Sequence, residues 1–172
     1  MKTPPKTYYL AYGSNLHPLR LKRRVSSARM IGTVELPGYA MSFIKRSKDG
    51  SAKCTISRSA DDCLVHAALF SLDPDQLAVL DECEGLGNGY EHEHITVEVT
   101  GVAYQAITYI AAESHVDKSL QPYHWYKGFV MAGMEYHGFP TGCMEAIQAI
   151  PSVQDPDVTR RRENEALHKE LS

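Results

Sequence analysis

The 172-residue sequence contains no long apolar run, no repeat and no low-complexity segment. No stretch approaches the roughly 20 apolar residues that cross a bilayer, so we expect no membrane segment. The apolar run at residues 7–12 is too short and too aromatic to be the core of a signal peptide. With no targeting segment in view, a cytoplasmic protein is expected.

Metal-binding patterns and an excess of charge are lacking as well. The four cysteines form no C-x-x-C pair and have no histidine at zinc-finger spacing, which predicts reduced, mostly packed thiols and no metal site. The net charge is only −3, so nothing favours nucleic acid as a partner. A composition of 43% hydrophobic and 23% charged residues is ordinary for a soluble globular protein.

The length of the chain suits one domain with a single core. We predict a single domain over residues 1–172, with its core at about 7–150 and a charged C-terminal tail at 151–172. Within this tail, residues 159–171 are helix-prone but expected to be solvated, because basic and acidic side chains alternate there.

Closely spaced extended segments, separated by turn residues, run through the chain up to residue 111. Strands are predicted at residues 7–12, 30–36, 39–46, 52–58, 64–72, 92–99 and 103–111. Helices are predicted at residues 16–24, 73–83, 122–134 and 142–149. This order predicts an α+β fold in which a mixed or antiparallel sheet curls into a small β-barrel with a few flanking helices.

One acidic residue stands out at the end of the helix predicted at 73–83. At a helical advance of about 100° per residue, Leu77, Leu80 and Glu84 fall on one face. Asp81 lies at the margin of this face and Glu82 points away from it. Partial burial and the helix C-terminus both disfavour an ionised carboxyl at position 84, which suits a proton-transfer group. From these residues alone, a simply solvated glutamate stays an open alternative.

A second feature is the break that follows the first predicted strand. A glycine there permits an unusual backbone angle, and successive backbone N–H groups in such a turn can bind an anion. The sequence lacks the Gly-Lys-Ser/Thr of a nucleotide-binding loop. An ordinary tight turn is the alternative. The residues concerned are Tyr12, Gly13, Ser14, Asn15 and Leu16.

Together these segments resemble one known family. Residues 9–16, Tyr-Leu-Ala-Tyr-Gly-Ser-Asn-Leu, resemble the opening signature of the γ-glutamyl cyclotransferase family, and residues 80–85 resemble its catalytic segment. Residues 126–140 resemble its later helix and turn. The resemblance implies that Glu84 is the general acid/base, that Tyr12 to Leu16 form the loop that anchors the substrate, and that Tyr126 lines the pocket. A core aromatic is the alternative role for Tyr126.

The resemblance also implies a reaction. The α-amine of a γ-glutamyl peptide or amino acid would attack its own γ-carbonyl and release 5-oxoproline, with no cofactor. The partner is then a small molecule, and a homodimer is left open. A γ-glutamylamine cyclotransferase, a lyase acting on a carrier-bound γ-glutamyl group and a non-catalytic binding module on the same fold are the alternatives. Assistance of Glu84 by Asp81 or Glu82 is also left open.

Other residues suggest sites less strongly. His92 and His94 are alternate residues of a predicted strand and share one face, but a third metal ligand at recognisable spacing is lacking. A solvated strand face is therefore the favoured interpretation of this pair.

Overall fold

The computed structural model describes residues 5–172, so residues 1–4 of the predicted domain lie outside the described part of the chain. The strands are β1 (Thr7–Ala11), β2 (Arg29–Pro37), β3 (Tyr39–Arg46), β4 (Ala52–Arg58), β5 (Leu64–Leu72), β6 (Tyr90–Val99) and β7 (Val102–Ala111). The α-helices are α1 (Pro18–Arg24), α2 (Leu77–Glu84), α3 (His124–Tyr136), α4 (Thr141–Gln148) and α5 (Val158–Leu171). Two short 3₁₀ turns, η1 (Pro74–Gln76) and η2 (Glu113–His115), precede α2 and follow β7.

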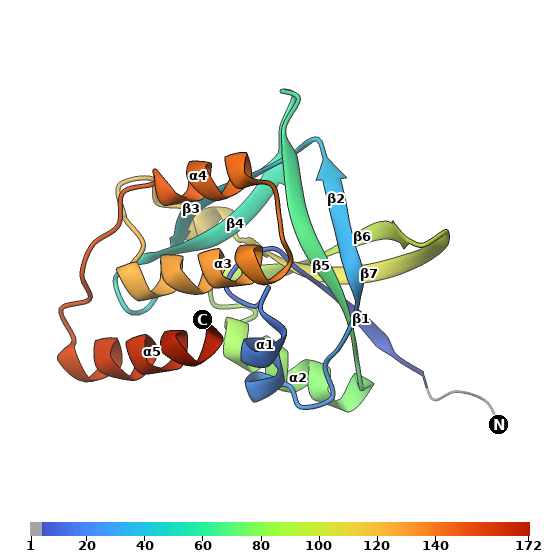
Figure 1. Cartoon of the computed structure of the whole chain (residues 1–172), viewed down its shortest axis with the longest axis horizontal. Coiled ribbons are helices and arrows are strands. Elements are labelled where there is room, and N and C mark those ends of the chain that lie inside the picture. Colours follow the sequence, from blue (N-terminus) through green and yellow to red (C-terminus); the bar gives the residue numbers. More distant parts are fainter. Residues whose placement is uncertain (1–4) are drawn as a thin grey trace.

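The strands form a mixed five-stranded sheet in the order β2-β5-β1-β7-β6 and a separate β3–β4 hairpin (Figure 1). Strands β1 and β7 pair in parallel, and the other neighbours pair antiparallel. The two edges of the large sheet approach each other, since a side chain at Gly32 in β2 would meet Val99 of β6 at 2.6 Å. The predicted α+β class and mixed sheet are confirmed. Between residues 5 and 172, however, the sheet is curled but not closed by hydrogen bonds between its edge strands.

The central strands β1 and β5 form the core of the large sheet. Most residues of both strands are buried, which is typical of strands that are covered on both faces. Leu10, Leu69 and Phe70 are 0–1% exposed and pack in one cluster with Leu80 of α2. This packing fixes the end of β1 and the last turn of α2 beside each other.

A β-bulge interrupts the pairing of the hairpin. The register shifts between Phe43 and Lys45, so that Lys45 lies opposite Lys53 of β4. An extra residue on one strand bends that strand and redirects the side chains beyond it. Two lysines therefore face each other near the end of the hairpin.

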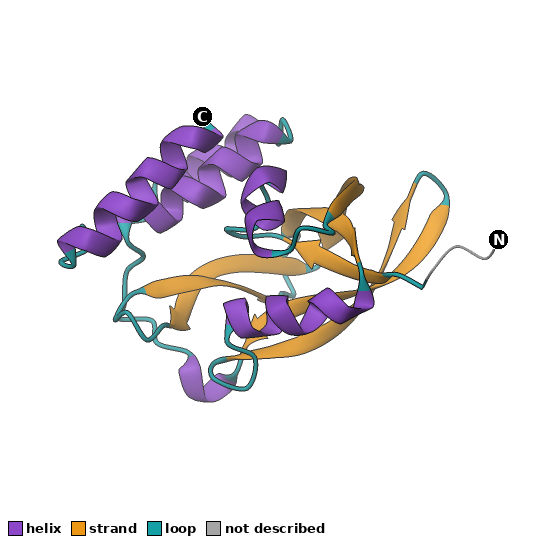
Figure 2. Cartoon of the chain, turned by 90° about the horizontal axis from the view of Figure 1, so that it is seen from below, coloured by secondary structure: helices purple, strands orange, loops and turns teal. Residues whose placement is uncertain are grey.

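The helices α3, α4 and α5 lie together on one side of the molecule (Figures 1 and 2). The C-terminal segment predicted as a solvated tail packs against α3. Leu171 is 9% exposed and forms a small cluster with Phe129, Ala132 and Leu167. Leu167 and Leu171 are four residues apart, so they share one face of an otherwise charged helix. No helix in the described part of the chain is long and apolar enough to cross a membrane.

Helix α3 supports the loop that follows β1. A β-carbon at Gly133 would lie 2.3 Å from Cβ of Leu16 and 3.0 Å from the backbone nitrogen of His17. The ring Nε2 of His137 is also hydrogen bonded to the carbonyl oxygen of Leu16 at 2.7 Å. The lack of a side chain at position 133 therefore sets how closely the helix and the loop approach.

This contact generates a prediction for Gly133→Ala. The added methyl group has no room against the loop backbone, so we expect a loss of about 1–3 kcal/mol in the free energy of unfolding, as for other overpacked cores. Urea unfolding followed by circular dichroism measures this loss.

Gly142→Ala is the matched control, because Gly142 lies in α4 and a β-carbon there meets no atom within 4 Å. We expect this variant to gain about 0.5–1 kcal/mol from helix propensity. Equal stability of the two variants would contradict the close packing of α3 on the loop.

Candidate active site

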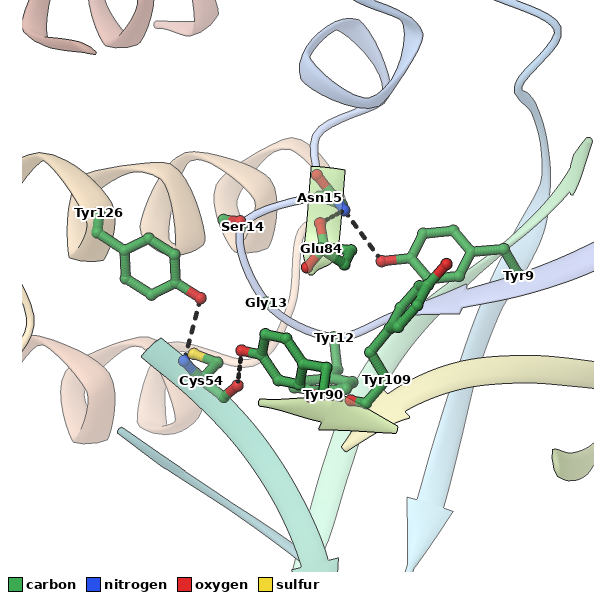
Figure 3. A pocket seen from close by; sticks show the side chains of 10 residues that line it. All are labelled: Tyr9, Tyr12, Gly13, Ser14, Asn15, Cys54, Glu84, Tyr90, Tyr109 and Tyr126. Carbon is green, nitrogen blue, oxygen red and sulfur yellow. Dashed lines mark hydrogen bonds between the residues drawn. The ribbon is translucent and has the colours of Figure 1, made fainter. Parts of the chain in front are cut away.

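A narrow pocket lies where the end of β1 meets the last turn of α2 and the aromatic side chains of β6, β7 and α3 (Figure 3). Its volume of about 20 Å³ is room for about one water molecule. A larger cavity of about 110 Å³ adjoins it and shares Ser14, Glu84, Tyr90 and Tyr126. A small organic ligand would therefore extend from the pocket into this cavity. The pocket is lined by Tyr9, Tyr12, Gly13, Ser14, Asn15, Cys54, Glu84, Tyr90, Tyr109 and Tyr126.

Glu84 is the last residue of α2, and Gly85 ends the helix with a φ of 72°. The side chain of Glu84 is only 15% exposed. Its Oε1 accepts hydrogen bonds from Nδ2 of Asn15 at 2.8 Å and from the guanidinium of Arg24 at 2.7 Å. Its Oε2 has no hydrogen-bond partner among residues 5–172. The carboxylate is thus held in place by one oxygen while the other is available.

The loop after β1 forms one wall of the pocket. The backbone N–H of Leu16 donates to the carbonyl oxygen of Gly13 at 3.1 Å and closes the turn. Within the described chain, no acceptor is hydrogen bonded to the backbone N–H groups of Gly13, Ser14 and Asn15. Three adjacent N–H groups of this kind can bind an anionic group such as a carboxylate.

Gly13 is required for space rather than for its backbone angle. Its φ is not positive, contrary to the unusual angle that we expected. A β-carbon at Gly13 would instead lie 3.1 Å from Cβ of Cys54 and 3.8 Å from the hydroxyl oxygen of Tyr126. Leu16 differs from the other predicted loop residues, because its side chain is 1% exposed in the core and does not line the pocket.

Five tyrosines surround Glu84, and burial raises the pKa of each of these hydroxyl groups. They are therefore neutral at physiological pH and provide hydrogen bonds without charge. Tyr126 does so while it also packs: its hydroxyl accepts from the backbone N–H of Cys54 at 3.0 Å, and its ring meets Phe43 edge to face. The five residues are Tyr9, Tyr12, Tyr90, Tyr109 and Tyr126.

The two acidic neighbours of Glu84 lie in different surroundings. Oδ1 of Asp81 accepts a hydrogen bond from the hydroxyl of Tyr109 at 2.6 Å and lies 2.7 Å from Nε2 of His92. Asp81 thereby orients a tyrosine of the pocket without lining the pocket itself. Glu82 is exposed. His92 is engaged with Asp81, and no group of three or more metal-ligating side chains occurs in the part of the chain that the structure describes.

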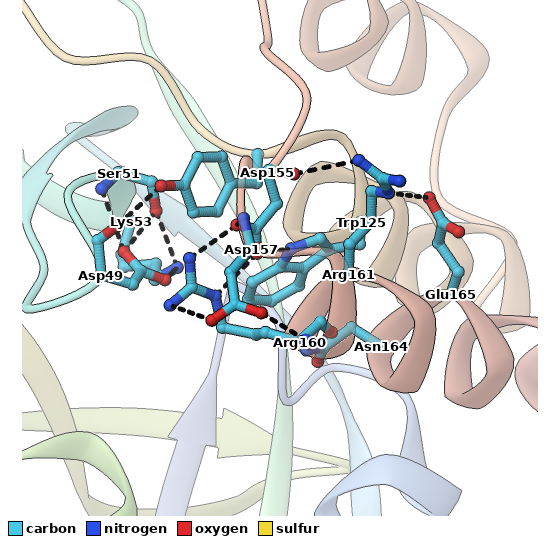
Figure 4. A network of polar contacts seen from close by, with 11 residues as sticks. Asp49, Ser51, Lys53, Trp125, Asp155, Asp157, Arg160, Arg161, Asn164 and Glu165 are labelled. Atoms are coloured by element: carbon cyan, nitrogen blue, oxygen red, sulfur yellow. Dashed lines mark hydrogen bonds and ion pairs between the residues drawn. The ribbon is translucent and has the colours of Figure 1, made fainter.

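The wall of the larger cavity is anchored to the C-terminal helix (Figure 4). Nε1 of Trp125, whose ring lines this cavity, donates to Oδ2 of Asp155 at 2.9 Å. The guanidinium of Arg160 makes two further hydrogen bonds to the Asp155 carboxylate, at 2.6 and 2.7 Å. Asp155 is 1% exposed, and its pKa is lowered to about 2, chiefly by these bonds from Arg160.

The structure thus brings together most of the residues that the sequence indicates, namely Tyr12, Gly13, Ser14, Asn15, Glu84 and Tyr126. It adds residues that sequence reasoning did not find: Arg24, Tyr9, Tyr90 and Tyr109. Arg24 lies 60 residues from Glu84, and only the docking of α1 against α2 brings the two together. No local pattern in the sequence marks Arg24 as a site residue, because nothing near it in the chain indicates that α1 docks against α2.

Comparisons with known proteins find one family and several solved structures that are similar to this chain. Residues 9–128 match the family described as γ-glutamyl cyclotransferase, AIG2-like, which is well over half of the chain. A search of curated protein sequences finds no significant match.

Solved structures with the same fold cover nearly the whole chain. A structure described as a γ-glutamyl cyclotransferase is 25% identical with a TM-score of 0.81, over 96% of this chain and 99% of the other. A crystal structure from Homo sapiens, described as an uncharacterized protein, is 26% identical with a TM-score of 0.80, over 95% and 98% of the two chains. YkqA from Bacillus subtilis shares the fold, with 20% identity and a TM-score of 0.70, over 86% of this chain and 56% of YkqA.

The buried carboxylate of Asp155 generates a prediction about stability. Asp155→Asn removes the charge that pairs with Arg160, so we expect the free energy of unfolding at pH 7 to fall by about 2–3 kcal/mol. Because the pKa of Asp155 is lowered on folding, its contribution is complete above about pH 4 and is lost as the pH falls towards 2. Denaturant titrations should therefore show that the difference in the free energy of unfolding between wild type and variant shrinks over this pH range.

Asp157→Asn is the matched control. Asp157 is exposed, and its side chain caps α5 by accepting from the backbone N–H of Arg160, a role that asparagine also performs. We expect this variant to unfold much like the wild type, because the ion pair of Asp157 with Arg160 is long, at 4.0 Å, and exposed. A pH-independent loss in Asp155→Asn would contradict the proposed role of the carboxylate charge.

Proposed function

Since the chain belongs to the γ-glutamyl cyclotransferase, AIG2-like family, we propose that it is a γ-glutamyl cyclotransferase that releases 5-oxoproline from γ-glutamyl peptides or amino acids without a cofactor. The observation that carries this proposal is the carboxylate of Glu84, 15% exposed and hydrogen bonded to the loop after β1. A glutamate that only ends a helix could lie in solvent. Glu84 is instead sheltered, and within residues 5–172 its Oε2 and the backbone N–H groups of residues 13–15 have no hydrogen-bond partner.

The proposed substrate binds through its two charged α-groups. Its α-carboxylate accepts hydrogen bonds from the backbone N–H groups of Gly13, Ser14 and Asn15, which have no other acceptor within residues 5–172. Its α-ammonium donates to Oε2 of Glu84 and to Oδ1 of Asn15. This Oδ1 supports the assignment, because it is buried with no hydrogen-bond partner among the residues that the structure describes, and such a group is costly unless a ligand satisfies it.

The proposed reaction begins with removal of a proton from the α-ammonium by Glu84. A model α-amino group has a pKa of about 7.7–8.0, so much of it is protonated and not nucleophilic at neutral pH. The freed nitrogen attacks the γ-carbonyl carbon, and the five-membered ring closes. Glu84 then returns this proton to the leaving nitrogen as the amide bond breaks. The second proton that the ring nitrogen loses passes over the same carboxylate, so the amine leaves as an ammonium and the lactam is neutral. No water is consumed in this step.

Positioning contributes more than proton transfer in this scheme. Holding the amine against the carbonyl corresponds to an effective concentration of up to about 10⁵–10⁸ M, whereas a positioned acid/base contributes about 10²–10⁴ in rate. The neutral tyrosine hydroxyls around the pocket add hydrogen bonds without a second negative charge that would compete for the substrate ammonium.

A substitution at Glu84 tests the proposal. We expect Glu84→Gln to lower kcat by about 10²–10⁴ because the amide cannot accept and return the proton. Release of 5-oxoproline from γ-glutamyl-alanine, measured by chromatography, gives the rate, and a thermal melt checks the fold.

Glu82→Gln is the matched control, since Glu82 lies on the same helix and is exposed. We expect it to keep nearly full activity. Near-full activity of Glu84→Gln would show that the base is assigned wrongly. A panel that adds γ-glutamyl amines and glutathione separates the alternative substrates, and no product from any of them would favour the non-catalytic binding module.

A further inference from the structure

The cavity beside the narrow pocket is lined by an excess of cationic side chains. Arg20, Arg24, Lys45 and Lys53 all line it, together with Ser47 and Trp125. Two carboxylates neutralise two of these four charges. Glu84 pairs with Arg24 at 2.7 Å, and Asp49 pairs with Lys53 at 2.7 Å (Figure 4). Arg20 and Lys45 are left as two cations without an acidic partner in the described chain.

Arg20 is buried, although no acceptor among the described residues is hydrogen bonded to its guanidinium. It is 5% exposed, its Nε is buried with no hydrogen-bond partner in the described part of the chain, and its guanidinium stacks 3.8 Å above the ring of Phe129. A guanidinium stays charged at neutral pH, and a buried charge without partners is costly unless an anion binds to it.

Lys45 is also 5% exposed and lacks both a hydrogen bond and an ion pair within the described residues. Its ammonium lies 4.4 Å from the centre of the Tyr90 ring. A β-carbon at position 89 would lie 2.7 Å from Cε of Lys45, so the glycine at position 89 makes room for the lysine side chain. The bulge in β3 sets Lys45 opposite Lys53, an arrangement of like charges that destabilises a strand pair.

We propose that Arg20 and Lys45 form an anion subsite for the leaving part of the substrate, and that they select γ-glutamyl compounds whose leaving amine belongs to an acidic amino acid. The cavity adjoins Glu84, where the leaving nitrogen receives its proton, so the leaving group enters it. The two cations come from separate elements, α1 and β3, which suits two separate carboxylates. This inference rests on the proposed function, because it assigns the direction in which the substrate extends.

Two isosteric substrates provide the test. We expect kcat/KM for γ-glutamyl-glutamate to exceed that for γ-glutamyl-glutamine by about tenfold or more, as one charge-assisted hydrogen bond provides. The difference should appear in KM, because the leaving group binds equally in the ground state and the transition state. Equal kcat/KM values in the wild-type enzyme would overturn the subsite without any variant, and turnover of both compounds would still support the proposed function.

Substitution of the lysine locates the subsite. In Lys45→Met the preference for γ-glutamyl-glutamate should fall to less than about threefold, while γ-glutamyl-glutamine is still converted. Lys48→Met is the matched control, since Lys48 is exposed on the same hairpin and does not line the cavity. Its preference should equal that of the wild type. Loss of preference in both variants would show a general effect of charge and overturn the assignment.

A measurement of binding distinguishes failure of the anion subsite from failure of the proposed function. Calorimetric titration of Glu84→Gln, alone and combined with Lys45→Met, measures the affinity for the two compounds without turnover. The combined variant is required because Glu84→Gln also frees Arg24 from its ion pair, and it should lower the affinity ratio. We expect γ-glutamyl-glutamate to bind at least about tenfold more tightly, and the advantage to shrink at high salt. If no γ-glutamyl compound yields 5-oxoproline, this ratio still decides on the anion subsite, and equal affinities would overturn it.

Discussion

The two hydrogen bonds to Oε1 of Glu84 join three pieces of chain that are far apart in sequence. Asn15 belongs to the loop after β1, Arg24 ends α1, and Glu84 ends α2. A carboxylate that is 15% exposed requires such donors, because burial of an unpaired charge is costly. Among residues 5–172 the same bonds leave Oε2 without a partner, so the contacts that stabilise the buried charge also orient its second oxygen. The arrangement of the pocket depends on this junction, since each of its three parts contributes to the lining of the pocket or of the adjoining cavity.

Charge is divided between the two hollows on either side of Glu84. The narrow pocket is lined by neutral tyrosine hydroxyls, whereas the adjoining cavity is lined by arginine and lysine side chains. Burial raises the pKa of the tyrosines and lowers the pKa of Lys45, so both hollows carry the cost of desolvated polar groups. A zwitterionic α-amino acid unit suits the first hollow, and an anionic remainder suits the second. Glu84 lies at the boundary, where the bond between these two parts of the substrate would break.

Much of the fold could be predicted because its signals are local. The strands at 39–46, 52–58 and 64–72 have the predicted bounds, since alternation and turn residues define each of them without reference to the rest of the chain. The helical period likewise placed Glu84 beside buried Leu80. What the sequence could not indicate depends on distant contacts. Arg24 joins the site only through the docking of two helices, and Gly13 is required by the nearness of Cys54 rather than by a backbone angle.

The bulge in β3 has a consequence for how this site can diverge. Paired residues of a hairpin share a face, and the extra residue between Phe43 and Lys45 is what sets two lysines opposite each other. Without the bulge, regular pairing from Phe43 onward would set Ile44 opposite Lys53, so an isoleucine would take the place of Lys45 beside the cavity. Under the proposed function, a change of register in this strand, and not only an exchange of cavity residues, would alter which leaving amines the cavity accepts.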